Sequence, residues 1–368
     1  MHHYIGLMSG TSVDAIDAVL VRIDPDNHLH LLATHQHPIS DSRRAEIQAL
    51  MLPGENEIDR EGELDMRLGR LFAEAVLAVL KAAGKAPSEI RAIGSHGQTI
   101  RHRPHSAQAF TRQIGNPSMI AELTGITTVA DFRARDVAAG GEGAPLVPAF
   151  HNAMFRQTGI NRAIVNIGGI ANVTYLPGDS GASVIGFDTG PGNTLLDQWV
   201  ARHQGRSHDQ RGEWAASGNI LQNLLERLLD DEYFSQSPPK STGREHFHTS
   251  WLSHHLSGSE SPADVQATLA ELTARSIAEA IHEWLPGSVD EVYVCGGGAH
   301  NTDLLRRLRL RLSDTPLATT TALGLDPDWV EATAFAWLAH QTLAGHPGNL
   351  PSVTGANRAV VLGGIYLA

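Results

Sequence analysis

Short apolar runs alternate with longer amphipathic stretches along this chain. Residues 4–8 and 15–23 read as strands on either side of a polar turn, and residues 163–175 repeat this strand–glycine turn–strand pattern almost half a chain later. These two strand–turn–strand hairpins suggest two related domains that face each other, so internal duplication is a working hypothesis.

Helices and further strands are predicted between these hairpins. Apolar residues recur three and four positions apart over 61–83 and 263–284, which indicates amphipathic helices. Residues 90–94 and 291–295 are short apolar runs that end at or beside a glycine, and they read as strands. Because strands alternate with helices of this length, the pattern favours an α/β architecture.

Composition narrows the class of protein. A chain of 368 residues is too long for one ordinary core and suits two domains. A net charge of −12 argues against sequence-independent binding to nucleic acid or to an anionic membrane. Cys295 is the only cysteine, and neither a signal peptide nor an apolar run of roughly 18 residues is found. We therefore expect a cytoplasmic protein.

The polar turn after the first strand combines glycine, hydroxyls and carboxylates. Glycine lets main-chain N–H groups approach a phosphate, and Asp14 or Asp17 could hold Mg²⁺ directly or through water. An ordinary polar hairpin turn is the alternative. The residues of this candidate phosphate turn are Gly10, Thr11, Ser12, Val13, Asp14, Ala15, Ile16 and Asp17.

A second glycine cluster follows the strand at 291–295. Gly296, Gly297 and Gly298 leave no side chains in the way of a flat ring, so an adenine could lie against the backbone there. Asn301 could border the nucleotide, or it could simply cap the helix predicted over 302–312. The motifs of P-loop NTPases, Rossmann dehydrogenases and α/β-hydrolases are absent from the sequence.

Two polar segments are candidates for chemistry. Asp188 stands beside a Gly-Pro-Gly turn and could be the general base of a phosphoryl transfer, or the side chain of an Asx turn or helix cap. Arg133 and Arg135 could pair with a substrate carboxylate or phosphate, with surface salt bridges as the alternative.

The arginine-rich run 306–311 falls in a helical pattern and is interpreted as a solvated face.

Together these segments resemble the anhydro-N-acetylmuramic acid kinase family. The resemblance extends over nearly the whole chain, in the family's order. The matching segments are 8–14, 94–101, 113–117, 130–148, 166–169, 187–193, 239–245, 294–301 and 329–339.

The resemblance implies an α/β, two-domain actin-like ATPase (sugar kinase) fold, each domain a mixed sheet of ribonuclease-H-like type flanked by helices, with a cleft between the domains. The first domain would span residues 1–150 and the second, nucleotide-binding domain 151–345, while residues from about 345 to 368 could pack back on the first. The implied reaction uses ATP, Mg²⁺ and water to convert 1,6-anhydro-N-acetylmuramic acid to N-acetylmuramate 6-phosphate, in peptidoglycan recycling. A homodimer is also implied.

The resemblance also implies roles for particular residues. Asp188 would activate the water that opens the anhydro ring. Thr99, Arg133 and Glu331 would contact the sugar. The residues implied to bind nucleotide are the turn Gly10–Asp17, Gly168, Gly169, Gly296, Gly297, Gly298 and Asn301, with Asp14 and Asp17 near Mg²⁺.

One position departs from the family pattern. Ala15 stands where the family usually has glycine. If that position needs a positive φ, alanine costs on the order of 1 kcal/mol and the turn is slightly displaced. We expect activity to survive.

Two other functions fit part of this pattern. A phosphohydrolase on the same fold would also use Asp188 and glycine turns, but it would consume ATP or polyphosphate without a sugar. An actin-like or heat-shock-ATPase-like assembly protein would form nucleotide-dependent filaments or bind peptides, with slow hydrolysis. Sugar-dependent ATP consumption separates the kinase from both.

Overall fold

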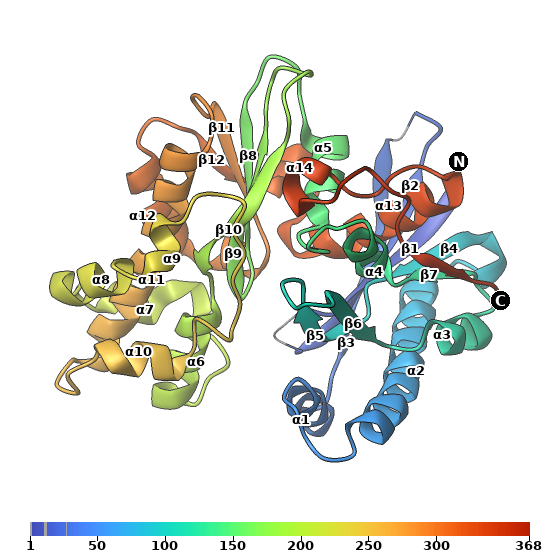
Figure 1. Cartoon of the computed structure of the whole chain (residues 1–368), viewed down its shortest axis with the longest axis horizontal. Coiled ribbons are helices and arrows are strands. Elements are labelled where there is room, and N and C mark those ends of the chain that lie inside the picture. The colour runs from blue at the N-terminus through green and yellow to red at the C-terminus, as the bar shows by residue number, and fades with distance from the viewer. Residues whose placement is uncertain (1, 11–12, 27) are drawn as a thin grey trace. The chain divides into compact units, whose positions relative to one another are not determined.

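The structure is a computed structural model and describes residues 2–10, 13–26 and 28–368. The chain forms two compact units (Figure 1). Unit 1 consists of the residues up to Met154 together with Trp329–Ala368, and unit 2 consists of Phe155–Asp328. The chain thus returns to unit 1 at Trp329, earlier than the boundary of about 345 expected from the sequence.

Unit 1 is built on a six-stranded mixed sheet. The first three strands form an antiparallel meander, the next two run parallel to the first strand, and the last is antiparallel to its neighbour. In spatial order the strands are β13 (Gly364–Tyr366), β7 (Thr128–Ala130), β4 (Ile90–Ser95), β1 (His2–Met8), β2 (Ala15–Ile23) and β3 (Leu29–Pro38).

Unit 2 repeats this topology in a five-stranded sheet. Again three strands form an antiparallel meander, and the following two are parallel to the first of them. Their spatial order is β10 (Ile185–Pro191), β9 (Ile170–Leu176), β8 (Arg162–Ile167), β11 (Glu291–Cys295) and β12 (Leu317–Thr319). Because strand order and direction agree between the units, the topology supports the hypothesis of internal duplication.

Helices complete unit 1, and a small two-stranded sheet, β5 (Gln98–Arg103) with β6 (Phe110–Ile114), extends it. The long helix α2 places apolar side chains such as Phe72 in the main core of this unit. The helices of unit 1 are α1 (Asp41–Leu50), α2 (Glu57–Ala83), α3 (Pro117–Thr124), α4 (Phe132–Ala138), α5 (Val147–Phe155), α13 (Val330–Ala344) and α14 (Pro351–Thr354).

Helix α13 belongs to unit 1 because its backbone lies directly on the central strands. A Cβ atom on Gly6 of β1 would lie 1.8 Å from the carbonyl oxygen of Ala332, and one on Gly94 of β4 would lie 1.9 Å from that of Phe335. Only glycine permits this approach. The residues after α13 stay with unit 1 as well, since Asn349 donates a hydrogen bond to the buried carboxylate of Asp136.

The long helix α11 dominates the helical part of unit 2, and most of its residues are buried. It contacts the sheet as well as the neighbouring helices α6, α7, α8 and α12. The helices of unit 2 are α6 (Thr194–Gln204), α7 (Glu213–Ser217), α8 (Gln222–Leu229), α9 (Glu232–Ser235), α10 (Thr249–His255), α11 (Pro262–Trp284) and α12 (Thr302–Leu312).

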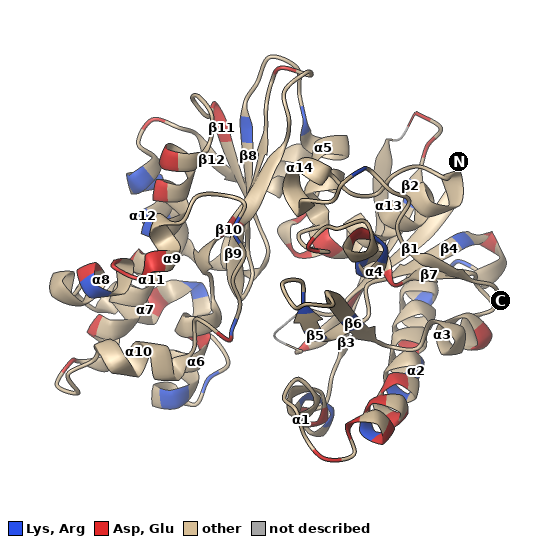
Figure 2. Cartoon of the chain, in the orientation of Figure 1, with Lys and Arg blue, Asp and Glu red and all other residues tan. Residues whose placement is uncertain are grey.

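The arginine-rich run on α12 is only partly a solvated face, so that interpretation is wrong for Arg307. Its guanidinium is buried and pairs with Asp303 of the same helix at 2.6 Å and with Glu271 of α11 at 3.0 Å. On α12 the basic residues follow Asp303, the acidic residue of its first turn (Figure 2). Arg307 therefore joins two helices by an ion-pair network.

The predicted hairpins, helices and strands are confirmed, with shifts of a few residues at their ends. The stretch expected as a helix over 61–83 is α2, which begins four residues earlier, and the helix expected over 302–312 is α12. Within the described part of the chain, no helix combines the length and apolar character needed to cross a membrane.

Candidate active site

The hairpin β1–β2 of unit 1 carries the candidate phosphate turn. Thr11 and Ser12 lie outside the described residues. The N–H of Val13 donates to the carbonyl oxygen of Gly10 at 3.2 Å, and Val13 is left-handed, with φ of 58°. A β-branched residue in this region is strained by roughly 1–2 kcal/mol, and the burial of its side chain in the core holds it there.

The departure at Ala15 carries no such strain. Ala15 is the first residue of β2 and pairs with Pro38 of β3, so its backbone is extended. The next residue, Ile16, is fully buried in the core of unit 1. Val13 and Ile16 could therefore face a phosphate only through their main chains, while alanine at position 15 fits its strand.

Two carboxylates flank this turn. The Asp14 carboxylate is mostly exposed and lies 3.1 Å from the Arg44 guanidinium, and Asp17 accepts a hydrogen bond from Gln36 at 3.2 Å. Magnesium in nucleotide sites is held by one or two carboxylates, with waters and phosphate oxygens completing the shell. These carboxylates fit that donor set; no cluster of three or more protein ligands occurs among the described residues.

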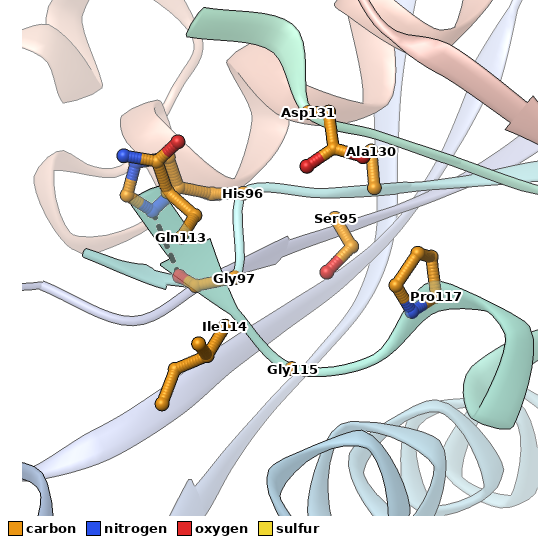
Figure 3. Close-up of a pocket in the computed structure, with 9 residues that line it drawn as sticks. All are labelled: Ser95, His96, Gly97, Gln113, Ile114, Gly115, Pro117, Ala130 and Asp131. Carbon is orange, nitrogen blue, oxygen red and sulfur yellow. Dashed lines mark hydrogen bonds between the residues drawn. The ribbon is translucent and has the colours of Figure 1, made fainter. Parts of the chain in front are cut away.

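The candidate sugar contacts belong to unit 1. Thr99 lies on β5 and accepts a hydrogen bond from Gln113 of β6 at 3.1 Å. Arg133 lies on α4 and donates to His96 at 3.0 Å and to the carbonyl oxygen of Gly143 at 2.8 Å. His96 and Gln113 line the same small cavity (Figure 3), so Thr99 and Arg133 are linked through neighbouring side chains.

Glu331, the third candidate sugar contact, lies on α13. It lies in the first turn of the helix, one turn before Phe335, and residues four apart share a helix face. The Phe335 ring packs on the imidazole of His96, with ring centroids 4.8 Å apart. Of the candidate sugar contacts, Arg133 therefore contacts His96 directly, and Glu331 lies one helical turn before the Phe335 ring that packs on it.

The cavity beside His96 is itself too small for a sugar. Its volume is about 10 Å³, which is the space of one water molecule. The hydroxyl of Ser95 is buried in its wall and has no hydrogen-bond partner among the described residues. Asp131, another wall residue, accepts a hydrogen bond from Tyr366. This cavity is therefore a water-sized pocket, and none of the three candidate sugar contacts lines it.

His96 is a neutral imidazole, and it accepts a hydrogen bond from Arg133. Its Nδ1–H donates to the carbonyl oxygen of Gly97 at 2.9 Å, which leaves Nε2 to accept from Arg133. Burial, and then the charge of Arg133, keep the pKa of His96 well below its usual range. The ring therefore orients the guanidinium without competing with its charge.

Buried neutral histidines make unit 1 sensitive to acid. Burial also lowers the pKa of His151, on α5, to about 3. Histidine in the unfolded chain takes up a proton near pH 6.5, whereas the buried ring stays neutral. The contribution of the buried ring to the free energy of unfolding is therefore fully present above about pH 6.5 and is lost as the pH falls below it. For His151 we expect a loss of about 2 kcal/mol in the free energy of unfolding between pH 7 and pH 5.

Urea unfolding at both pH values measures this loss. His151→Leu should shrink the difference between pH 7 and pH 5 by about 2 kcal/mol, whatever its effect on stability at pH 7. The exposed His28 supplies the matched control, because His28→Leu makes the same substitution at a position outside the core. An equal pH dependence in wild type and His151→Leu would contradict the burial argument.

In unit 2 the glycine turn between β8 and β9 meets the turn after β10. The N–H of Gly192 donates to the carbonyl oxygen of Gly169 at 2.9 Å, and that of Asn193 donates to Gly168 at 2.8 Å. A Cβ on Gly192 would lie 2.3 Å from the Gly168 oxygen, so this close approach requires glycine. The two turns form one rigid backbone surface.

The Gly296–Gly298 turn packs on the end of β8. A Cβ atom on Gly296 would lie 2.3 Å from Oδ1 of Asn166, and one on Gly298 would lie 2.3 Å from the Ile167 side chain. Packing thus accounts for two of the three glycines. Gly297 is exposed, and the nearest atom to an added Cβ, the Nδ2 of Asn193, lies 3.8 Å away.

Asn301 caps a helix, which was the alternative left open by the sequence. Its Oδ1 accepts a hydrogen bond from the N–H of Leu304 at 3.0 Å at the start of α12. Helix capping is therefore enough to explain an asparagine at position 301, whether or not a nucleotide binds beside it.

Gly297 allows a direct test of nucleotide binding at this turn. Gly297→Val adds a side chain that the fold can accept, so the free energy of unfolding should stay within about 0.5 kcal/mol of wild type. If adenosine lies against this glycine, the KM for ATP should rise at least tenfold, about 1.4 kcal/mol of lost binding. Steady-state kinetics with varied ATP measures it.

The control for Gly297→Val is Gly181→Val. Gly181 is also exposed in unit 2 and has a backbone conformation that side chains adopt readily. An unchanged KM for ATP in Gly297→Val, equal to that of the control, would remove this turn from the nucleotide site.

Asp188 lies on β10, where the strand is irregular. It pairs with Asn172 of β9, and the register shifts between Asp188 and Gly190. A β-bulge bends the strand and redirects side chains. The Asp188 carboxylate is half-buried, and its Oδ2 accepts a hydrogen bond from the N–H of Thr242 at 3.0 Å.

Sequence reasoning missed the residues that hold Asp188. Tyr233 donates its hydroxyl to the Asp188 carbonyl oxygen at 2.7 Å, and the Asp188 N–H donates to the carbonyl oxygen of Lys240 at 3.2 Å. The segment 239–245 stood out in the resemblance, but no spacing or periodicity linked it to Asp188. Only the fold brings them together.

Comparisons with known proteins agree with this architecture. The crystal structure of component A of the (R)-2-hydroxyglutaryl-CoA dehydratase of Acidaminococcus fermentans covers 94% of this chain and 100% of its own, with a TM-score of 0.50 and 12% identity. That likeness concerns the fold alone. The α/β, two-domain actin-like ATPase fold expected from the sequence is confirmed.

The sequence relatives are much closer. An anhydro-N-acetylmuramic acid kinase of Coxiella burnetii is 53% identical over 364 residues, with 99% of this chain and 97% of the relative covered. One from Shewanella loihica is 52% identical, with 99% and 98% covered. The family model described as anhydro-N-acetylmuramic acid kinase matches residues 2–368. The chain therefore belongs to the anhydro-N-acetylmuramic acid kinase family.

Proposed function

We propose that the protein uses ATP and water to convert 1,6-anhydro-N-acetylmuramic acid to N-acetylmuramate 6-phosphate and ADP. The observation that carries this proposal is the match of residues 2–368 to the kinase family. The bond between C1 and O6 of the sugar breaks, water supplies the new oxygen at C1, and O6 takes the γ-phosphoryl group of ATP. Ring opening relieves the strain of the bicyclic sugar in the same step.

Asp188 is the proposed general base. A carboxylate within hydrogen-bond reach of the attacking water can take its proton as the new bond to C1 forms. The hydrogen bond from the Thr242 N–H gives this carboxylate a defined orientation. A fixed base suits a reaction that depends on positioning one water molecule.

The glycine turns are the proposed nucleotide contacts. Main-chain N–H groups at Gly10–Asp17 and at Gly168–Gly169 would bind the phosphates, and the Gly296–Asn301 turn would border adenosine. Asp14 and Asp17 have the oxygen donors that suit Mg²⁺. When bound, the ion would offset the negative charge of the phosphates.

Arg133, Thr99 and Glu331 are the proposed sugar contacts. Muramic acid carries a carboxylate, and a guanidinium is the side chain best suited to bind one. The neutral His96 and the carbonyl oxygen of Gly143 hold the Arg133 guanidinium in place. Its charge would thus be ready before the sugar arrives.

The reaction belongs to the recycling of peptidoglycan, and we propose that the protein performs it in the cytoplasm as a homodimer. Sedimentation analysis of the purified protein tests the dimer. A net charge of −12 supports a small-molecule substrate over nucleic acid.

ADP release tests the activity. Purified protein with Mg-ATP should release ADP only when 1,6-anhydro-N-acetylmuramic acid is present, with one ADP formed for each sugar phosphate. Sugar-independent release would favour a phosphohydrolase, and nucleotide-dependent filaments without release would favour an assembly protein. Release with N-acetylmuramic acid but not with its anhydro form would show that ring opening is no part of the reaction.

A further inference from the structure

Residues 233–242 hold Asp188 by three hydrogen bonds. The Asp188 N–H donates to the Lys240 carbonyl oxygen at 3.2 Å, and its carboxylate accepts from the Thr242 N–H at 3.0 Å. Its carbonyl oxygen accepts from the Tyr233 hydroxyl at 2.7 Å. Main chain and side chain of Asp188 are therefore both held from outside its own hairpin.

Lys240 anchors this segment in the interior of unit 2. It is buried, and its ammonium group donates to the carbonyl oxygens of Tyr233 and Phe234, each at 3.2 Å. The nitrogen also lies 4.9 Å from the centre of the Tyr233 ring and 5.8 Å from that of Trp284. A buried cation bonded to carbonyls and aromatic faces fixes the backbone on either side of it.

The helix that carries Tyr233 is fixed in turn by Asp231. One carboxylate oxygen of Asp231 accepts from the N–H of Tyr233 at 3.0 Å at the start of α9. The other bonds to the His246 ring at 3.0 Å and to the Trp251 indole N–H at 2.9 Å. Tyr233 is thereby tied at its backbone as well as at its hydroxyl.

We propose that Tyr233 is a positioning residue, which acts through the Asp188 main chain to aim the carboxylate at the attacking water. The inference rests on the proposed role of Asp188 as base. The bulge in β10 interrupts the regular ladder beside Asp188, so the strand alone does not fix its backbone. The Tyr233 hydroxyl supplies the missing restraint, and a misplacement of about 1 Å can slow a reaction by about a hundredfold.

Tyr233→Phe tests this inference, because it removes one hydroxyl and keeps the ring. We expect kcat to fall about tenfold, while the KM for ATP stays within about twofold of wild type. Tyr175→Phe is the matched control. Tyr175 is also a buried tyrosine of unit 2 that donates to a main-chain carbonyl, that of Pro286 at 2.9 Å, and its loss should leave kcat unchanged.

A second variant covers the case in which Tyr233→Phe fails to fold. Lys240→Met removes the anchoring charge and keeps the length of the side chain, and it should also lower kcat without raising the KM for ATP. Asp188→Asn is measured beside these variants. If Asp188→Asn is inactive but Tyr233→Phe and Lys240→Met keep the wild-type kcat, the positioning role alone is overturned. If Asp188→Asn still turns over, the proposed base is overturned and this inference with it.

An equal fall of kcat in Tyr233→Phe and Tyr175→Phe would also overturn the inference, because it would show a general effect of lost hydrogen bonds in unit 2. Urea unfolding of each variant supports this comparison. The positioning role predicts similar stabilities and different kcat values for the two Phe variants.

Discussion

Asp188→Asn should lower kcat on the order of 10³-fold while the affinity for ATP stays close to that of wild type. Asparagine keeps the size of the side chain and an oxygen that can accept the Thr242 N–H, but it cannot take a proton from water. The expected loss corresponds to about 4 kcal/mol of transition-state stabilisation. Sugar-dependent ADP release gives kcat, and equilibrium binding of ATP gives the affinity.

Asp290→Asn is the control for this substitution. Asp290 is a second carboxylate of unit 2 that accepts a main-chain N–H, that of Asn161 at 2.7 Å. Its replacement removes one negative charge from the same unit and should leave kcat within about twofold of wild type. Near-normal turnover by Asp188→Asn would exclude Asp188 from the mechanism.

Arg307→Leu should lower the free energy of unfolding by about 3 kcal/mol. The substitution removes the cation that lies between Asp303 and Glu271, both of which are buried. Two buried carboxylates would then keep only their other partners, Arg306 and Arg311. Urea unfolding measures the loss, and kcat of the folded enzyme should not change.

Arg306→Leu provides the comparison on the same helix. Arg306 also pairs with Asp303, at 2.7 Å, but more than half of its side chain is exposed. Exposed ion pairs contribute little, so the expected loss is below about 1 kcal/mol. Equal losses for Arg306→Leu and Arg307→Leu would contradict the assignment of Arg307 as a buried link between α11 and α12.

Most of the fold could be predicted from local patterns. The hairpins β1–β2 and β8–β9 combine apolar strands with glycine turns, and α2 and α11 show a clear helical period. Domain membership was harder, because nothing in the composition of α13 indicates that it packs on the strands of unit 1. Gly6 and Gly94 allow α13 to pack closely on β1 and β4, but this role can be seen only once the helix is placed on these strands.

The candidate site could be predicted where chemistry and turn geometry coincide in sequence. Asp188 stands beside a Gly-Pro-Gly turn, so one short segment contains both the proposed base and its setting. The residues that hold it, Tyr233 and Thr242, lie 45 and 54 positions away and follow no motif that points to it. Gly296 and Gly298 show the limit of a glycine pattern, since packing on β8 already requires both residues and they do not by themselves indicate a ligand.

The most direct test of the central claim is the origin of the oxygen at C1 of the product. The enzyme is given Mg-ATP and 1,6-anhydro-N-acetylmuramic acid in water enriched in heavy oxygen, and the reaction is stopped before the anomeric position of the free product exchanges. Mass spectrometry should then find one heavy oxygen, at C1, and a sugar heavier by one phosphoryl group and one water. Heavy oxygen in inorganic phosphate, with an unchanged sugar, would contradict the coupled reaction.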